Sequence, residues 1–286
     1  MDPSPSPRVG SPAELLDPAV ARVVRRAAGV ANRAVDDLRS DLLAGAGTSR
    51  RHVKRDGSPV TDADRAVDRA LVTAFTDAFP DHGVLSEEGD TTWHGAEWTW
   101  VVDPIDGTSN YAAGLPWWCV SVGLAHHGEV VWGMVDAPEL GRRWEATRGG
   151  ATTRDGRLVH VAEPVDVSRR VAANHPVAVT QGTIRRRRRG TFYKARVMGS
   201  AALELAMVAD GTLLAAYQRV PKAWDVAAGG LLVTEAGGAV VCPDQPSHFP
   251  LQPGVDVAGQ GVVTAAGPDR AWVQDFVERL WPDDES

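Results

Sequence analysis

The chain has 286 residues and a formal net charge of −7, with 43% hydrophobic and 23% charged residues. These values are typical of soluble globular proteins and exclude disordered and collagen-like classes. The acidic balance gives no general attraction to nucleic acid or to anionic membranes. The chain has only two cysteines, Cys119 and Cys242, and lacks an apolar segment of about 18 residues. We therefore expect a soluble cytoplasmic protein without a membrane span.

The apolar spacing predicts helices first and strands after them. Residues 1–12 are rich in proline and serine, which is typical of a disordered lead-in. Thr61 or Asp62 is placed to cap the second helix. In chain order we expect helices over residues 15–43 and 63–79, strands over 83–86, 100–102, 119–125, 130–135 and 142–147, and two further short strands. The turns between the later strands are typical of an antiparallel meander.

Strands and helices alternate beyond residue 165, as in α/β proteins. We expect strands over residues 171–173, 213–216, 239–241 and 261–265, and helices over 201–209, 226–236 and 270–280. This change in the order of predicted elements predicts two subdomains, one over residues 13–165 and one over residues 166–286.

A stiff acidic turn follows the apolar run 100–102. It carries Asp103 and Asp106, and Pro104 fixes φ while Gly107 allows a backbone conformation that other residues resist. Like charges at this spacing are unfavourable without a cation. Closely spaced carboxylates suit a hard cation such as Mg²⁺. The turn therefore predicts a metal site.

Two more acids lie at the ends of predicted elements. Glu87 follows the strand over 83–86, and Asp225 precedes the helix over 226–236. Taken alone, Asp225 is equally well explained as an acid that interacts with the helix dipole. His126 and His127 have no ligand spacing with other soft donors, so we expect no zinc site through them.

Three segments carry a resemblance to the inositol monophosphatase family of Mg²⁺-dependent, lithium-sensitive phosphatases. They are 85–88 (LSEE), 102–111 (VDPIDGTSNY) and 223–238 (AWDVAAGGLLVTEAGG), in the family's order and spacing. The resemblance implies a five-layer αβαβα sandwich of the α+β or α/β class, as in fructose-1,6-bisphosphatase. It also implies hydrolysis of a small phosphate monoester by metal-activated water, with two or three Mg²⁺ ions and inhibition by Li⁺.

The resemblance also implies roles for individual residues. The first metal site would use Glu87, Asp103 and the carbonyl of Ile105, and the second Asp103, Asp106 and Asp225. Thr108 and Asp64 would orient the attacking water, which completes a catalytic set with Glu87. Lys54 lies where the family has a lysine near the metals, although a lone lysine in a basic loop is more often solvated.

Substrate contacts are implied for the phosphate and for the alcohol. The residues concerned are Gly107, Thr108, Gly199, Ser200, Ala201, Gln218 and Asp225. Gln218 occupies the position where inositol-specific enzymes carry a glutamate. An amide loses the charge-assisted acceptor, and charge-assisted hydrogen bonds are roughly twice as strong as neutral ones. Histidinol phosphate and fructose bisphosphate are therefore alternatives to an inositol phosphate.

The arginine run over residues 185–189 leaves a second class of function open. It lacks interleaved aromatic residues, which favours an exposed loop over a nucleic-acid patch. Some bacterial members of the family bind the transcription machinery, so an RNA or transcription-machinery interaction protein is the alternative. The resemblance also implies a homodimer that binds a small phosphorylated metabolite.

Overall fold

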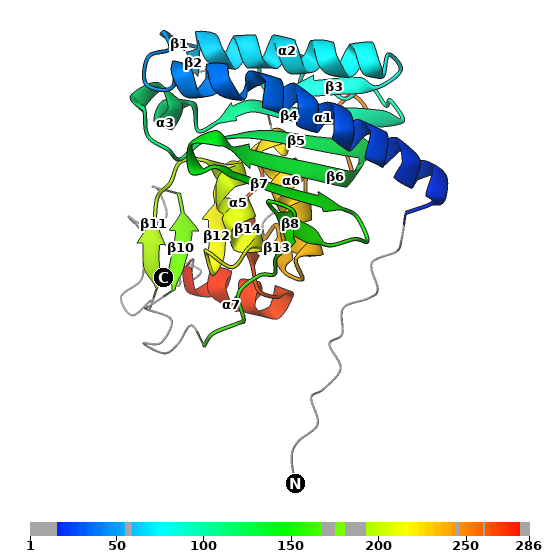
Figure 1. Ribbon diagram of the computed structural model, residues 1–286. Helices are drawn as coiled ribbons and strands as arrows, with labels where there is room; N and C mark the ends of the chain where they lie inside the picture. The colour runs from blue at the N-terminus through cyan, green and yellow to red at the C-terminus, as the bar shows by residue number, and fades with distance from the viewer. Residues whose placement is uncertain are drawn as a thin grey trace.

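The computed structural model describes residues 16–54, 59–166, 175–180, 193–243, 246–259 and 261–280. Within them, helices and sheets alternate in five layers, from α1 and α2 at the top of Figure 1 to α7 at the bottom. The αβαβα sandwich that the motifs implied is therefore confirmed. No helix in this part of the chain is both long and apolar enough to span a membrane.

The first layer consists of two long amphipathic helices, α1 (Pro18–Gly45) and α2 (Asp62–Ala78). Each buries one stripe, because its apolar residues recur with the helical period. Thr61 caps α2 through its side chain, as predicted. A small antiparallel hairpin, β1 (Arg51–Val53) with β2 (Pro59–Thr61), precedes α2.

In the described part of the chain, the second layer is a seven-stranded sheet with the order β3-β4-β5-β6-β7-β8-β9. Its strands are β3 (Gly83–Ser86), β4 (Trp98–Asp106), β5 (Cys119–His126), β6 (Glu129–Ala137), β7 (Arg142–Thr147), β8 (Thr152–Arg154) and β9 (Arg157–Leu158). Among the described strands of this sheet, only β3 and β4 pair in parallel, so the predicted meander from β5 onward is confirmed. A short helix, α3 (Thr108–Ala113), links β4 to β5, and a 3-10 turn (Pro138–Leu140) links β6 to β7.

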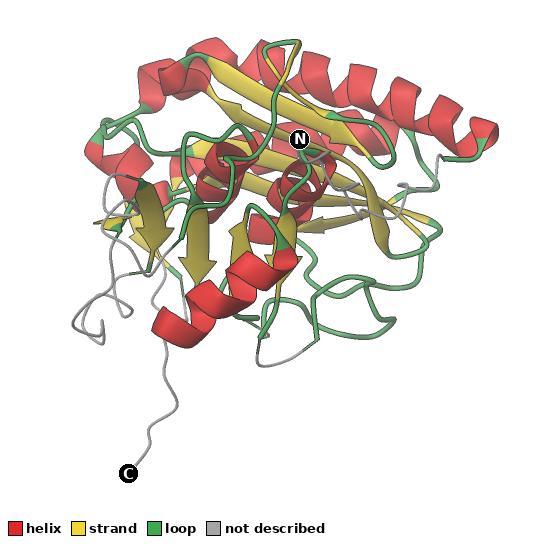
Figure 2. Ribbon diagram, turned by 90° about the horizontal axis from the view of Figure 1, so that it is seen from below, coloured by secondary structure: helices red, strands yellow, loops and turns green. Residues whose placement is uncertain are grey.

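The middle helices, α5 (Ala201–Ala209) and α6 (Ala223–Glu235), lie between the two sheets and are apolar on nearly all sides. The five-stranded sheet below them has the order β11-β10-β12-β14-β13 among the described residues. Its strands are β10 (Pro176–Val179), β11 (Lys194–Arg196), β12 (Ala215–Gln218), β13 (Ala239–Val241) and β14 (Thr264–Gly267). The last helix, α7 (Arg270–Leu280), lies across the outer face of this sheet (Figure 2).

Three apolar clusters fill the spaces between layers. One joins α1 and α2 to the large sheet, one joins that sheet to α5 and α6 and these helices to the small sheet, and one joins the small sheet to α7. The middle helices approach the large sheet closely: a Cβ on Gly133 of β6 would lie 2.8 Å from the Cα of Ala228 on α6. This contact sets the distance between α6 and the large sheet, which also contains the strand that carries the acids.

Several element boundaries differ from the sequence prediction. β12 begins two residues late: Leu213 and Leu214 are buried but precede the strand, and only the N–H of Leu214 donates to β10, at the carbonyl of Pro176. β14 is also displaced toward the C-terminus, and α6 begins at Ala223. β10 and β11 were not predicted at all. The expected strand over 171–173 and the lead-in over 1–12 lie outside the described residues, and the two-subdomain division stays a prediction.

Candidate active site

The sequence predicted that Asp103 and Asp106 lie in a turn after residue 102, but β4 continues through both acids to Asp106, and the turn begins only at Gly107. The pairing of β4 with β5 shifts register between Asp103 and Asp106, so a bulge separates these two acids. Gly107 then adopts φ 93°, and a Cβ there would lie 2.8 Å from the carbonyl oxygen of Trp117. Both observations require glycine at this turn, from which α3 starts at Thr108.

Three acids from two elements meet at this turn. Asp103, Asp106 and Asp225 each offer a carboxylate oxygen, and these atoms lie within 4.8 Å of one another. Asp225 lies in the first turn of α6, where its Oδ2 accepts a 2.7 Å hydrogen bond from the backbone N–H of Lys222. The capping role considered for this residue is therefore real, and it also fixes the carboxylate beside the other two acids.

The N-terminus of α5 holds Asp106 in place. The hydroxyl of Ser200 donates to Asp106 Oδ2 at 2.7 Å, and the N–H of Ala202 donates to the same oxygen at 2.6 Å. The sequence indicated only a substrate-facing loop at Gly199, Ser200 and Ala201. The loop lies at the carboxylate cluster, because it contacts Asp106. The hydroxyl of Ser200, however, already donates its hydrogen bond to this aspartate.

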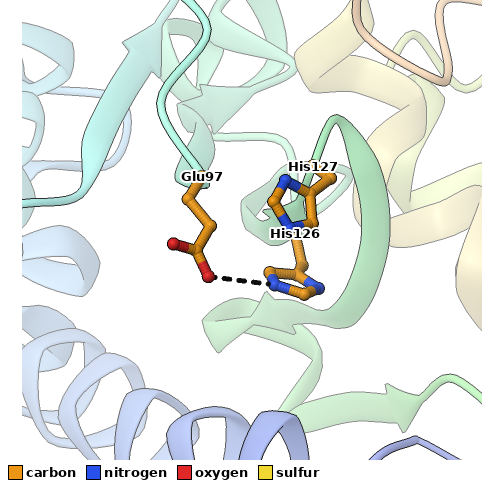
Figure 3. Close-up of side chains that lie close together, drawn as sticks. All are labelled: Glu97, His126 and His127. Carbon is orange, nitrogen blue, oxygen red and sulfur yellow. Dashed lines mark hydrogen bonds and ion pairs between the residues drawn. The ribbon is translucent and has the colours of Figure 1, made fainter.

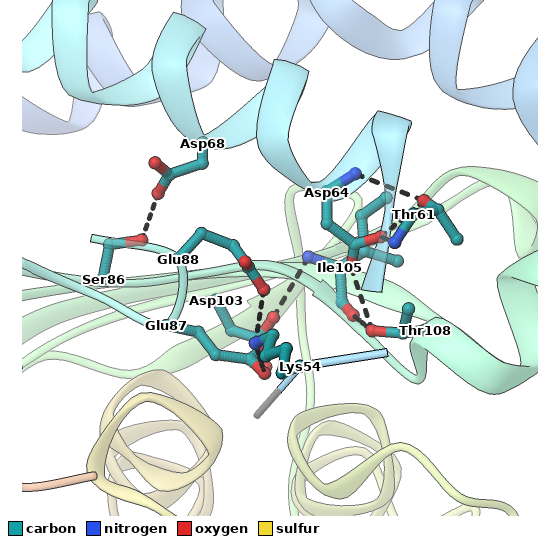
Figure 4. Close-up of polar contacts among 10 residues, drawn as sticks. All are labelled: Lys54, Thr61, Asp64, Asp68, Ser86, Glu87, Glu88, Asp103, Ile105 and Thr108. Carbon is teal, nitrogen blue, oxygen red and sulfur yellow. Dashed lines mark hydrogen bonds and ion pairs between the residues drawn. The ribbon is translucent and has the colours of Figure 1, made fainter. Parts of the chain in front are cut away.

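Glu87 joins the cluster from the end of β3. Lys54 forms ion pairs with Glu87 at 2.7 Å and with Glu88 at 2.5 Å (Figure 4). The sequence favoured a solvated loop for Lys54, which was wrong. Burial lowers the pKa of Lys54, but the two glutamates outweigh this effect and raise it overall.

A chain of hydrogen bonds connects the turn to α2. Thr108 Oγ1 donates to Asp64 Oδ1 at 2.9 Å and lies 3.1 Å from the carbonyl oxygen of Ile105. The other oxygen of Asp64 accepts from the backbone N–H of Thr61 at 2.8 Å and from its hydroxyl at 2.5 Å (Figure 4). The structure thus brings the predicted pair, Thr108 and Asp64, into direct contact.

The electrostatics of the cluster fit a divalent cation. Burial raises the pKa of Asp103 well above its usual range, and the surrounding carboxylates add to this shift. Burial and Asp106 do the same for Asp225. Burial also raises the pKa of Glu87, against the effect of Lys54. Acids in such surroundings ionise together only when positive charge neutralises them, and an all-oxygen donor set suits Mg²⁺.

Gln218 lies farther back, behind the start of α5. Its Nε2 donates to the carbonyl of Ala201 at 2.8 Å and to Glu204 Oε2 at 3.3 Å. Its Oε1 is buried and has no hydrogen-bond partner among the residues that the structure describes. Burial raises the pKa of Glu204 to about 7, although the hydrogen bond from Gln218 opposes the shift.

Sequence reasoning missed Glu204. The residue is the single acid of the otherwise apolar α5 and is only 4% exposed. A charged residue in a helix that is apolar on all sides is a recognisable signal, because buried charges are rare unless they are paired. The contact of Ser200 with Asp106 had no such signal, since a helix-capping serine explains the sequence equally well.

A layered α/β sandwich with a carboxylate cluster and a Thr–Asp pair defines a metal-dependent hydrolase. The model of the inositol monophosphatase family matches residues 16–277. The chain belongs to the inositol monophosphatase family, and it is a phosphatase by class.

Three similar proteins illustrate the range of the family. A histidinol-phosphatase from Mycobacterium tuberculosis is 36% identical over 76% of this chain and 86% of its own length. A Nus factor SuhB from Xylella fastidiosa is 36% identical over 63% of this chain and 67% of its own length. The solved structure of an IMPase from Thermotoga maritima superposes with a TM-score of 0.73 at 26% identity, covering 90% of this chain and 96% of that one.

Proposed function

We propose that the chain hydrolyses a small phosphate monoester with two or three Mg²⁺ ions held by Glu87, Asp103, the carbonyl of Ile105, Asp106 and Asp225. The observation that carries the proposal is the approach of three carboxylates to within 4.8 Å in surroundings that raise their pKa. When bound, Mg²⁺ supplies charge that stabilises phosphate oxygens and the leaving alkoxide, and it lowers the pKa of water. Li⁺ is the expected inhibitor.

Thr108 and Asp64 are proposed to orient the nucleophilic water. The hydroxyl proton of Thr108 is directed toward Asp64, so its oxygen presents lone pairs to a water molecule. A water that donates to this oxygen is held with its own lone pair free to attack phosphorus. The backbone N–H groups of Gly107 and Thr108, at the turn before α3, are proposed to bind the phosphate, with Asp225 near its leaving group.

The test of this function is phosphate release from a panel of small monoesters. We expect activity that requires Mg²⁺, falls in chelator and is inhibited by Li⁺. Asp103→Asn should abolish it while leaving the circular dichroism spectrum unchanged, because the amide loses a bridging charge but keeps the shape. Asp90→Asn, on an exposed loop carboxylate, is the matched control. Full activity of Asp103→Asn, or in excess chelator, would contradict the proposal.

The choice of alcohol is proposed to depend on Gln218 with the loop at Gly199, Ser200 and Ala201. A carboxylate at position 218 would lose both donor bonds of the amide and stand beside Glu204, where like charges repel. We therefore propose a substrate other than an inositol phosphate, with histidinol phosphate and fructose bisphosphate as the first candidates.

A variant pair tests the role of Gln218. Gln218→Glu should lower kcat/KM on the preferred ester without creating an inositol phosphatase, and Gln218→Glu with Glu204→Gln should recover part of the loss by moving the charge. Improved inositol phosphate hydrolysis by the single variant would contradict this reading. The measurement is the kcat/KM ratio between the two esters for each variant.

A cytoplasmic homodimer is proposed as the working form. Three large apolar side chains, Leu115, Trp117 and Val197, are 48%, 38% and 49% exposed. Asn110 Nδ2 donates to the carbonyls of both Trp117 and Met198, so the two segments are adjacent. Both cysteines are free, as in a reducing compartment. Light scattering should give a dimer mass that Trp117→Ser with Val197→Asp reduces to a monomer.

A second role in transcription is proposed on the name of the Nus factor relative and on the arginine run. That run lies outside the described residues. Replacement of residues 185–189 by serine should remove binding to RNA or RNA polymerase while phosphatase activity persists. If no binding exists in the unaltered chain, the second role is wrong and the phosphatase assignment is unaffected.

A further inference from the structure

A second group of metal-ligating side chains lies at the far end of β4 from the catalytic turn. Glu97 directly precedes β4, whereas Asp103 and Asp106 lie near its other end. Glu97 lies six residues before Asp103 and nine before Asp106, so the extended strand separates it from them by roughly 20–30 Å. The imidazoles of His126 and His127, at the turn from β5 to β6, lie beside Glu97 (Figure 3). None of the three belongs to the catalytic cluster. The sequence predicted no zinc site at these histidines, because Glu97 is distant from them along the chain.

The three side chains are close enough to share one ion. One ligand atom from each lies within 4.8 Å of the others. His126 Nε2 is 3.4 Å from Glu97 Oε1, and the carboxylate faces this ring in Figure 3. Ligands of a transition metal at about 2.0–2.2 Å stand a little over 3 Å apart, so small side-chain rotations are enough to close the site.

The backbone of the turn brings two consecutive histidines to the same side. Successive residues of a strand normally point to opposite faces. His127 has φ 50°, in the left-handed region, which breaks this alternation and places its ring 4.2 Å from the ring of His126. The backbone N–H of His127 donates to the carbonyl of Glu97 at 2.7 Å. His127 therefore also holds the backbone of Glu97 in place.

Packing limits the freedom of the central ligand. The ring of His126 stands 4.2 Å from that of Trp98, and its side chain is 19% exposed. Glu97 is 62% exposed and His127 is on the surface, so an ion can enter from solvent. A cavity of about 730 Å³ borders both histidines and leaves room for water as a further ligand.

We propose that Glu97, His126 and His127 bind a divalent transition-metal ion of the Zn²⁺ class, at a site independent of the catalytic cluster. Two imidazole nitrogens and one carboxylate oxygen suit Zn²⁺, whereas Mg²⁺ prefers oxygen donors alone. The two sites are therefore selective for different ions. A bound ion would fasten the segment before β4 to the turn between β5 and β6.

Other exposed histidines of the chain provide controls. His94 pairs with Asp90 at 3.0 Å, and His52 pairs with Asp62 at 2.8 Å. Neither pair has a third metal-ligating side chain within reach among the described residues. These controls therefore distinguish metal binding by a histidine beside one carboxylate from metal binding by the three-ligand group.

The experiment is a Zn²⁺ titration of the full chain in excess Mg²⁺, followed by calorimetry. We expect one equivalent of Zn²⁺ to bind, and His126→Ala or His127→Ala to weaken its affinity more than about tenfold. Glu97→Gln should weaken it as well, and because this side chain is mostly exposed the variant keeps the fold. His94→Ala should bind as the unaltered chain does.

A spectroscopic readout separates this site from the all-oxygen catalytic cluster. Cu²⁺ bound in excess Mg²⁺ should show imidazole nitrogen coupling in its electron paramagnetic resonance spectrum. His126→Ala should reduce this coupling, and His126→Ala with His127→Ala should remove it, while phosphate release without added zinc stays unchanged. Equal Zn²⁺ affinity in all four variants, or loss of coupling in His94→Ala alone, would overturn the proposal.

Discussion

At the scale of single residues, Thr108 connects the acidic turn to α2. Its hydroxyl lies between Asp64 and the carbonyl of Ile105, and it is 9% exposed. The neighbouring hydroxyl, Ser109, is on the surface of the same short helix. Two adjacent hydroxyls in one motif therefore have different surroundings, and only one of them contacts Asp64.

Thr108→Val tests this difference, because valine keeps the shape of threonine and removes the hydroxyl. We expect kcat to fall by about 10²–10⁴-fold, the range for loss of a group that positions or transfers a proton. KM and the affinity for Mg²⁺ should change much less. The measurement is steady-state kinetics beside Ser109→Ala, which should retain full activity. A similar loss in both variants would assign the effect to α3 as a whole.

At the scale of elements, a buried ion-pair group joins α1 to the large sheet. Asp136 of β6 is fully buried and accepts from Arg39 of α1 at 2.6 Å and from Arg143 of β7 at 2.8 Å. Arg143 also pairs with Asp36 of α1 at 2.7 Å. This ion-pair group fixes one helix and two strands relative to one another. It therefore contributes more to stability than a surface ion pair does.

Asp136→Ala should lower the free energy of unfolding by about 3–5 kcal/mol, because it removes the buried anion that both arginines share and leaves, among the described residues, only Arg143 with a second acidic partner, Asp36. Asp275→Ala is the control: it removes a surface pair with Arg279 on α7 and should change stability by less than about 0.5 kcal/mol. Urea unfolding followed by circular dichroism gives both values. An equal loss of unfolding free energy in the two variants would show that the buried ion-pair group stabilises the fold no more than a surface pair does.

At the scale of the whole molecule, Glu204 makes the stability of the sandwich depend on pH. It lies in the middle layer, and burial raises its pKa from the ordinary 4.5 to about 7. Below pH 4.5 the carboxyl is neutral in both states. Between these two values the unfolded chain releases the proton that the folded chain retains, so stability falls as pH rises.

Glu204→Gln should remove this dependence. Relative to the unaltered chain, the variant should gain up to about 3 kcal/mol in free energy of unfolding between pH 4.5 and pH 8, because 1 pKa unit corresponds to about 1.4 kcal/mol. Glu139→Gln, at an exposed glutamate, is the control. Denaturant unfolding at both pH values in chelator is the measurement, and a constant difference between variant and parent would contradict the assignment.

The sequence by itself determined the helices α1, α2, α5 and α7, the meander of the large sheet, and the glycine turn that follows Asp103 and Asp106. Hydrophobic period and turn residues are local properties, so they can be read without knowing what lies opposite. Glu87 and Asp225 were recognised as candidates by their places at element ends and by the motifs around them.

Only the tertiary structure decided which groups face one another. It brought Ser200 to Asp106, Lys54 to Glu87 and Glu88, and Glu204 to Gln218, all across long sequence separations. It also moved the starts of β12 and α6, because apolar spacing reports burial and not hydrogen-bond pairing. The approach of Glu97 to two histidines is of the same kind. Such contacts depend on how layers pack, and no local pattern in the chain records that geometry.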